Sequence, residues 1–160
     1  MVKIEENLKA AQYSISSLQK SLLNILFTAG WIKNHMQRRL KPYGLSPEQF
    51  NVLRILRGAN PDSLCVKDIT CKMIDRNSNT TRILDKLESK GLIEKRQSEM
   101  DRREYRIYLS EAGYTLLAQI DLEFPDDFYG FAKMSDANAD ELSQLLDKLR
   151  SSSGYISECD

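Results

Sequence analysis

A polar cluster in the middle of the chain carries side chains that hydrogen-bond well to nucleic acids. Its members are Arg76, Asn77, Ser78, Asn79, Thr81 and Arg82. Amide and guanidinium groups make two-point hydrogen bonds to the edges of adenine and guanine in the major groove. Hydroxyl groups and the free N–H groups of a helix start bind phosphate. The cluster therefore predicts DNA contact in the major groove, although Asn77 and Ser78 could instead only cap the helix.

A second basic cluster lies further along the chain. Two short runs with strand character, residues 92–97 and 104–109, flank a loop whose charged side chains include Asp101, Arg102 and Arg103. A short amphipathic helix that stops at Gly91 precedes them. A helix, a stop glycine and a hairpin with a basic tip indicate a winged helix. An arginine at such a tip can enter a narrow minor groove; the alternative is a solvated tip with a weak ion pair.

The distribution of charge supports a polyanionic partner. Residues 1–106 hold 20 Lys and Arg against 12 Asp and Glu, whereas residues 107–160 hold 3 against 11. One basic and one acidic part suggest that one surface faces a polyanion, although a solvated surface without a partner would look the same. Three further cations are candidates for phosphate contacts of low individual specificity: Lys67, Lys95 and Arg96.

The polar and basic side chains described above must be positioned by helices. Residues 46–49 read Ser-Pro-Glu-Gln, in which the serine caps a helix, the proline takes its first position and the glutamine completes a capping box. Two shorter helices are expected over residues 66–74 and about 78–90, and a short turn between them would make a helix-turn-helix. Their expected inward positions include Ile69, Met73, Ile74, Thr81, Leu84 and Leu87.

Leucine-rich segments flank this unit at both ends of the chain. Residues 8–40 predict one long helix, and residues 111–124 and 136–150 predict two more. The apolar seam of the long helix consists of Ile15, Leu18, Leu22, Ile25, Ala29, Ile32 and Met36. A small winged helix needs less apolar surface than this, so pairing with a second copy is the simplest use. Intrachain core is the alternative.

The predicted fold class is mainly α with a small β-hairpin wing, a winged helix-turn-helix flanked by dimerisation helices. We expect an N-terminal dimerisation helix in residues 1–40, the DNA-binding winged helix-turn-helix in 41–110 and C-terminal dimerisation helices in 111–160, intertwined in one domain. The length of 160 residues agrees with one domain. No apolar run approaches the roughly 18–20 residues that span a bilayer. Residues 1–10 lack a signal-peptide core, and three cysteines make no disulfide framework, so we expect a cytoplasmic protein.

The sequence lacks the common catalytic and cofactor motifs. Its single histidine, His35, argues against chemistry that needs a His pair or triad. There is no Gly-rich phosphate loop, no HExxH and no CxxC, and three scattered cysteines lack zinc-ligand spacing. We therefore expect no enzyme, no cofactor and no metal site.

Four short motifs follow one another at tight spacing. They are Asn-Ser-Asn-Thr-Thr-Arg at 77–82, Leu-Glu-x-Lys-Gly-Leu-Ile at 87–93, Asp-Arg-Arg at 101–103 and Leu-Ser-x-x-Gly at 109–113. Together they resemble the MarR (multiple antibiotic resistance regulator) family of bacterial transcription factors, over nearly the whole chain. The resemblance implies a homodimer that binds a pseudo-palindromic operator in double-stranded DNA, usually as a repressor. It also implies release by a small, often phenolic, effector or by cysteine oxidation.

The resemblance also implies roles for individual residues. Arg103 matches the family's wing-tip arginine and Asp101 its acidic partner, although Arg102 could serve in place of Arg103. In the family a pocket between the dimer helices and the winged helix takes the effector. Residues that could line it here, unless they are plain core, are Trp31, His35 and Tyr43.

Two alternative functions stay open at this point. Cys65 and Cys71 lie around the first helix of the helix-turn-helix and could sense oxidation, which needs an exposed thiol of lowered pKa. The family's oxidation sensors usually carry that cysteine near the N-terminus, where this chain has none. The second alternative is a winged helix that serves as a protein-interaction module without a DNA site, as the zero net charge allows.

Overall fold

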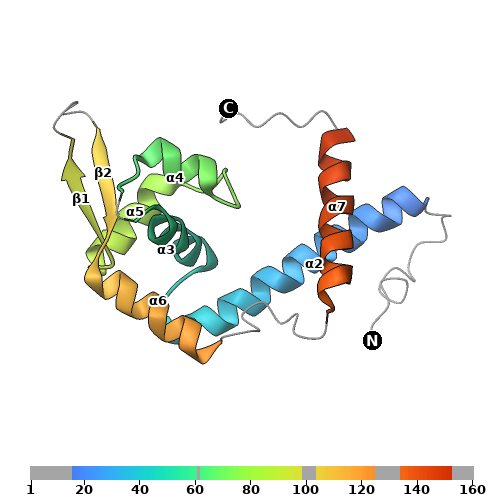
Figure 1. Ribbon diagram of the computed structural model, residues 1–160, viewed down its shortest axis with the longest axis horizontal. Coiled ribbons are helices and arrows are strands. Elements are labelled where there is room, and N and C mark those ends of the chain that lie inside the picture. The colour runs from blue at the N-terminus through green and yellow to red at the C-terminus, as the bar shows by residue number, and fades with distance from the viewer. Residues whose placement is uncertain (1–15, 61, 99–103, 125–133, 153–160) are drawn as a thin grey trace.

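The computed structural model describes residues 16–60, 62–98, 104–124 and 134–152. Within them the chain is mainly helical, with one two-stranded antiparallel sheet (Figure 1). The elements are α2 (Ser17–Leu40), η1 (Lys41–Tyr43), α3 (Pro47–Ala59), α4 (Val66–Lys72), α5 (Thr80–Ser89), β1 (Ile93–Gln97), β2 (Tyr105–Leu109), α6 (Glu111–Glu123) and α7 (Asp136–Ser152). The predicted fold class, mainly α with a small β-hairpin wing, is confirmed, while pairing of the flanking helices stays a prediction. No helix in these ranges is both long and apolar enough to cross a membrane.

Polar caps decide where the helices begin. The Ser46 hydroxyl accepts from the N–H of Gln49 at 3.2 Å, and Gln49 Oε1 accepts from the N–H of Ser46 at 3.1 Å, as the capping-box motif predicts. Ser16 and Gln19 form the same box in front of α2. Because Ser16 has extended backbone, α2 begins at Ser17 and not at residue 8 as predicted. Residues 8–15 lie outside the described ranges.

The hydrophobic core lies where α3, α4, α5, the sheet and α6 meet, and the C-terminal end of α2 closes it. Its fully buried side chains are Leu40, Val52, Leu53, Leu56, Ile69, Leu84, Leu87, Ile107, Leu117 and Ile120. Each such side chain contributes about 1.5–3 kcal/mol when it leaves water. The core therefore belongs to the winged helix and α6.

Two predicted inward positions are wrong. Ile74 is 81% exposed, because α4 ends at Lys72 and the extended backbone of Met73 interrupts the helical spacing. Thr81 is exposed, because the buried face of α5 follows the spacing Thr80, Leu84 and Leu87, and Thr81 lies about 100° around the helix from Thr80. The buried face of α5 consists of Thr80, Leu84 and Leu87.

Four elements meet at a junction formed by Gly91, Leu92, Ser110 and Gly113, here called the Ser110 junction. The Ser110 hydroxyl donates to the Gly91 carbonyl oxygen at 2.7 Å and accepts from the N–H of Gly113 at 3.0 Å. The N–H of Ser110 donates to the Leu92 carbonyl oxygen at 3.2 Å. Gly91 has a φ of +69°, which glycine adopts without strain. The junction joins the end of α5, the hairpin and the start of α6.

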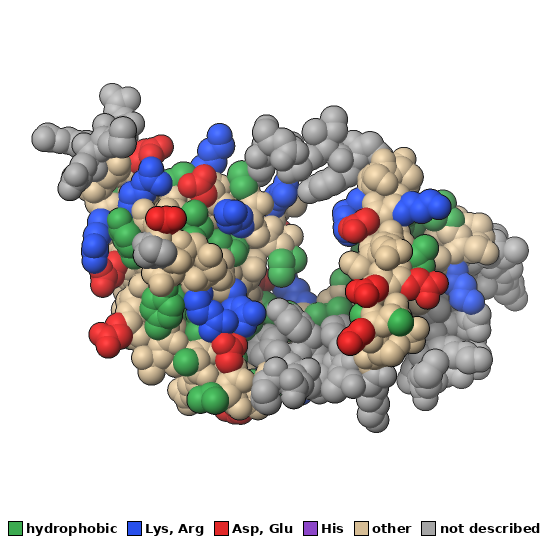
Figure 2. All heavy atoms as spheres, in the orientation of Figure 1, with side chains coloured by type: hydrophobic (Ala, Val, Ile, Leu, Met, Phe, Trp, Pro, Cys, Tyr) green, Lys and Arg blue, Asp and Glu red, His purple; other side chains and the backbone are tan. Residues whose placement is uncertain are grey.

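Helix α7 and the N-terminal part of α2 lie outside this core. Figure 1 shows α7 well away from α3–α6, and α7 contains no buried residue. A gap between α7 and the winged-helix body is visible in the space-filling view (Figure 2). On α2, Leu26 is 69% exposed and Phe27 is 54% exposed. These helices present apolar side chains that the described part of the chain does not cover.

Gly113→Ala is expected to lower the free energy of unfolding by about 1–3 kcal/mol. A Cβ there would collide with the Leu92 carbonyl oxygen and come within 2.6 Å of Leu109 Cδ1. Urea denaturation followed by circular dichroism measures the change. Gly58→Ala is the matched control: nothing lies within 4 Å of its Cβ position, so a gain of about 0.5–1 kcal/mol is expected in the helix. Equal effects at the two glycines would contradict the close packing at the Ser110 junction.

Candidate nucleic-acid interface

Helices α4 and α5 form the helix-turn-helix, and a buried hydroxyl pair holds them together. Thr70 Oγ1 donates to Thr80 Oγ1 at 2.8 Å, across the turn from one helix to the other. Asn51 Oδ1, on α3, accepts from the N–H of Ile74 at 3.0 Å and so holds the turn from a third helix. The direction in which α5 leaves the turn is therefore set by α3 and α4 together.

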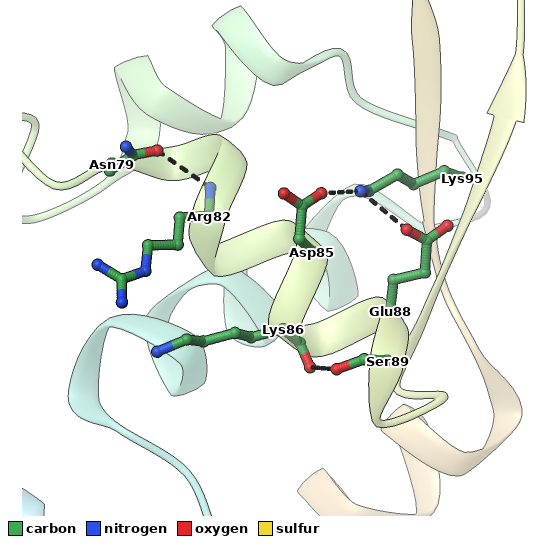
Figure 3. Close-up of polar contacts among 7 residues, drawn as sticks. All are labelled: Asn79, Arg82, Asp85, Lys86, Glu88, Ser89 and Lys95. Carbon is green, nitrogen blue, oxygen red and sulfur yellow. Dashed lines mark hydrogen bonds and ion pairs between the residues drawn. The ribbon is translucent and has the colours of Figure 1, made fainter.

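Asn79 caps α5, a role that the sequence suggested for Asn77 and Ser78. Its Oδ1 accepts from the N–H of Arg82 at 3.0 Å (Figure 3). Asn77 is exposed, with its N–H bonded to Asp75 Oδ1 at 3.2 Å, while Arg76 and Ser78 are half-buried. All six members of the polar cluster thus lie in or beside the first turn of α5.

A basic face runs along α5 beyond this cluster. Figure 3 shows Arg82 and Lys86 pointing to one side of the helix and Asp85 and Glu88 to another. A groove of about 800 Å³ between α5 and the start of α3 is lined by residues that include Ser78, Asn79, Arg82, Lys86 and Lys90. Sequence reasoning left out Lys86 and Lys90 as contacts, although their spacing of four residues from Arg82 onward places them on one helical face.

Of these cations, Lys90 is already engaged with the protein. Its ammonium donates to the carbonyl oxygen of Gly44 at 2.5 Å and to Gln49 Oε1 at 3.1 Å. It therefore ties the end of α5 to the start of α3. No hydrogen bond or ion pair of the Arg82 or Lys86 side chain is found within the described ranges, and both side chains are exposed. These two are the cations on this face that are available to a ligand.

The hairpin lies beside α5 and contains two of the predicted phosphate contacts. In the β1–β2 register Lys95 pairs with Ile107 and Arg96 with Arg106. The Lys95 ammonium lies between Asp85 and Glu88 of α5, at 2.5 and 2.8 Å, and only 17% of its side chain is exposed. These two carboxylates make Lys95 less available to phosphate than the sequence predicted. Their pairing with Lys95 could not be read from the sequence.

The Arg96 side chain is more exposed to solvent than that of Lys95. The Arg96 guanidinium pairs with Glu94 at 2.7 Å and lies 4.7 Å from the ring centroid of Tyr108. The hydrogen bond and charge of Glu94 raise the pKa of Arg96, which stays a cation. Lys67 is exposed on α4. The predicted wing-tip residues lie outside the described ranges: Asp101, Arg102 and Arg103.

Comparison with known proteins identifies the family. Residues 45–105 match the description "MarR family". The chain is 30% identical over 115 residues to the transcriptional repressor MprA of Escherichia coli strain K12. The aligned region covers 71% of this chain and 65% of MprA. The chain belongs to the MarR family. It is also 34% identical over 97 residues to the HTH-type transcriptional regulator MhqR of Bacillus subtilis strain 168, covering 59% of this chain and 62% of MhqR. The matches therefore span less than two thirds of the length of these MarR relatives.

Solved structures of MarR proteins share the fold. The organohalide-sensing regulator RdhR in its 2,4-dichlorophenol-bound form matches with a TM-score of 0.75 at 25% identity, covering 86% of this chain and 82% of that one. A mutant MarR of Escherichia coli complexed with operator DNA matches with a TM-score of 0.68 at 22% identity, covering 78% and 89%. The relatives are regulators and not enzymes.

The three residues predicted for an effector pocket take part in two separate contacts within the described ranges, and their role in a pocket stays a prediction. Trp31 stacks on His35, with ring centroids 5.8 Å apart, and Trp31 is 42% exposed. His35 Nε2 is buried without a hydrogen-bond partner among the described atoms. The Tyr43 hydroxyl donates to the Glu123 carboxylate, which raises the pKa of Tyr43 to about 12. Tyr43 thus ties η1 to the end of α6.

An apolar pocket of about 410 Å³ lies on another face of α2, between α2, α3 and the turn before α5. The residues that line it are Ala29, Ile32, Lys33, Met36, Pro47, Glu48, Asn51, Met73, Ile74 and Asp75. Lys33 and Glu48 form an ion pair of 3.0 Å there, and the hydrogen bond that the Lys33 ammonium donates to the Glu48 carboxylate raises the pKa of Lys33. Sequence reasoning missed this pocket because its walls come from three separate segments.

Cys65 has a structural role that bears on the redox alternative. Its sulfur accepts from the N–H of Asp68 at 3.4 Å, and Asp68 Oδ2 accepts from the N–H of Cys65 at 3.1 Å. Hydrogen bonds with the side chain and backbone of Cys65 hold the pKa of Asp68 below its ordinary value. Cys65 is therefore the N-cap of α4. No group of three or more His, Cys, Asp or Glu suited to a metal ion occurs in the described ranges.

Asn79→Ala is expected to lower the free energy of unfolding by about 1 kcal/mol, because α5 loses its cap. Asn79→Ser should retain most of the stability, since the serine hydroxyl can accept the same hydrogen bond. Asn77→Ala is the matched control and should change the stability by less than about 0.5 kcal/mol, as is usual for an exposed side chain. Urea denaturation measures all three. A larger loss at Asn77 than at Asn79 would contradict the assignment of the cap.

Proposed function

We propose that this chain is a sequence-specific DNA-binding transcriptional regulator that acts as a homodimeric repressor. The observation that carries the proposal is the exposed face of α5, on which a capped helix start and the unengaged cations Arg82 and Lys86 lie together in a MarR winged helix. The structural neighbour complexed with operator DNA and the repressor MprA support the same function.

In this proposal α5 enters the major groove with its N-terminal turn. The Arg82 guanidinium can bond in two-point fashion to guanine, and the exposed amide of Asn77 can bond to adenine. Thr81 and the N–H groups of the first turn face the phosphates at the groove edge. Arg96 and Lys67 add phosphate contacts, and the hairpin tip with Arg103 adds a minor-groove contact.

The dimer is supported by the apolar faces that the terminal helices leave uncovered. Leu26 and Phe27 on α2 and Leu145 on α7 are each more than half exposed. Exposed contiguous apolar surface on a helix is typical of an interaction site. A second copy of this chain would bury these faces with two-fold symmetry, and a two-fold dimer matches an inverted-repeat operator.

We propose the apolar pocket between α2, α3 and the turn, and not Trp31, His35 and Tyr43, as the effector site. Its volume of about 410 Å³ suits a small molecule. Asn51 and Ile74 line it, and the hydrogen bond between them holds the turn that leads into α5. A ligand in the pocket would therefore bear directly on the direction of α5. The neighbour with bound 2,4-dichlorophenol favours a phenolic compound.

Selection from a random DNA pool tests the regulator. We expect enrichment of an inverted repeat whose half-site centres lie about one helical turn, or a multiple of it, apart. Arg82→Ala should weaken binding by about 5- to 150-fold, which corresponds to the loss of one good base contact. Lys148→Ala, on α7, removes the same charge and should have little effect. Binding should weaken steeply with salt. A protein-interaction module would enrich no sequence, and that outcome would exclude the proposal.

A titration with 2,4-dichlorophenol tests the effector site. The compound should release the wild-type protein from its selected DNA, whereas Ala29→Phe, which fills the pocket, should bind DNA without being released. Ala118→Phe, an exposed alanine on α6, is the control and should respond like the wild type. Fluorescence anisotropy of labelled DNA measures release. An unchanged response of Ala29→Phe would place the effector elsewhere.

A further inference from the structure

The Lys95 ammonium joins the wing to the recognition helix. It lies 2.5 Å from Asp85 Oδ1 and 2.8 Å from Glu88 Oε2, the two carboxylates that point from α5 toward the hairpin (Figure 3). The Lys95 side chain is 17% exposed, whereas those of Asp85 and Glu88 are 62% and 45% exposed. The carboxylates thus cover the ammonium from the solvent side. We call these three residues the Lys95 bridge.

The bridge lies further along the hairpin than the backbone hydrogen bond that joins α5 to Leu92, the residue before β1. At the base of the hairpin the N–H of Leu92 donates to the Leu87 carbonyl oxygen at 3.0 Å. Lys95 follows on β1 in the direction of the tip and reaches back to α5. A hairpin held only at its base can pivot about that base. A second attachment at Lys95 removes that freedom.

The opposite strand is held at the same level. Ile107, the partner of Lys95 in the β1–β2 register, forms two backbone hydrogen bonds with Leu64, of 2.9 and 3.2 Å. Ile107 is also fully buried. The hairpin is therefore fixed on one side through Ile107 to the segment before α4, and on the other through Lys95 to α5.

Among the neighbouring charges in the described ranges, Arg96, Arg82 and Lys86 form no second link between the hairpin and α5. Arg96 pairs with Glu94 on its own strand and lies over Tyr108 of β2. Arg82 and Lys86 point to the other side of α5 (Figure 3). Partial burial disfavours the charged form of Lys95, but hydrogen bonds and charges from Asp85 and Glu88 outweigh this and raise the pKa of Lys95. Lys95 therefore remains a cation between its partners.

We propose that the Lys95 bridge is a positioning contact that sets the angle between the wing and the recognition helix, so that both meet one DNA half-site in register. The inference rests on the proposed function, because it assigns a role within DNA recognition. It differs from the phosphate contact expected from the sequence, in which Lys95 would face the DNA backbone.

Neutralising the two carboxylates distinguishes the positioning role from a simple effect of charge, because the two hypotheses predict opposite changes in DNA affinity. Asp85→Asn with Glu88→Gln removes negative charge from a DNA-binding helix, so charge alone would make binding tighter. The positioning role requires the opposite. We expect the double variant to bind the selected site about tenfold or more weakly, through loss of the wing's contacts. The loss of base preference should be confined to the outer positions next to the wing, with preferences under α5 unchanged.

Three single variants complete the test. Lys95→Met should reproduce the loss of base preference at the outer positions, and Lys95→Arg should retain wild-type binding because it keeps the cation between both carboxylates. Glu94→Gln is the matched control, since it removes a hairpin carboxylate that takes no part in the bridge. Its base preferences should equal those of the wild type.

The measurements are affinities of the full chain for the selected site and its single-base variants at several salt concentrations. Tighter or equal binding by the double variant would overturn the inference. So would a salt slope that falls by about 0.9 for each Lys95→Met protomer while all base preferences stay at their wild-type values, the sign of a lost phosphate contact alone. A uniform loss at all positions with a lowered melting temperature would also overturn it, because it would mean general destabilisation. If the wild-type chain selects no DNA, the proposed function fails first and the inference fails with it.

Discussion

The arrangement of the DNA-facing elements depends on the Ser110 junction. One buried hydroxyl bonds to the end of α5 through the Gly91 carbonyl oxygen and to the first turn of α6 through the N–H of Gly113. Because the same residue follows β2 directly, the recognition helix, the wing and α6 share one fixed point. A displacement of α6 would therefore be transmitted to the wing and α5 together, which suits the proposed dimer, in which outer helices would pair and central helices would bind DNA.

The charged side chains of α5 lie on two different faces of the helix. One face carries Arg82 and Lys86 into solvent, and the other holds Asp85 and Glu88 against Lys95. Acidic residues on a helix that approaches phosphates would normally oppose binding. The ion pairs of Asp85 and Glu88 with Lys95 of the hairpin explain why α5 carries these acidic residues. The apolar pocket proposed as the effector site lies beside the turn before α5, which Asn51 holds. The proposed effector site and the proposed DNA-binding face are thus linked through that turn.

Local sequence signals predicted the helix-turn-helix and the wing, because capping boxes, stop glycines and alternating strands act over a few residues. The Ser46 box and both strands occur where expected, within a residue. The same signals failed where the chain changed direction. Met73 leaves the helix, so Ile74 faces solvent, and Thr80 instead of Thr81 lies on the buried face of α5. A helical period predicts the inward side only while the backbone stays helical.

The sequence by itself determined the family, the kinds of elements and the polar helix start, since these depend on residue types close together in the chain. Only the tertiary structure decided which charges are available to DNA. Lys95 and Arg82 look alike as sequence, yet one is enclosed by two carboxylates of α5 and the other is exposed. The apolar pocket, formed from three distant segments, was decided in the same way. The physical reason is that pairing and burial depend on which elements pack side by side, and packing joins residues that the chain order keeps apart.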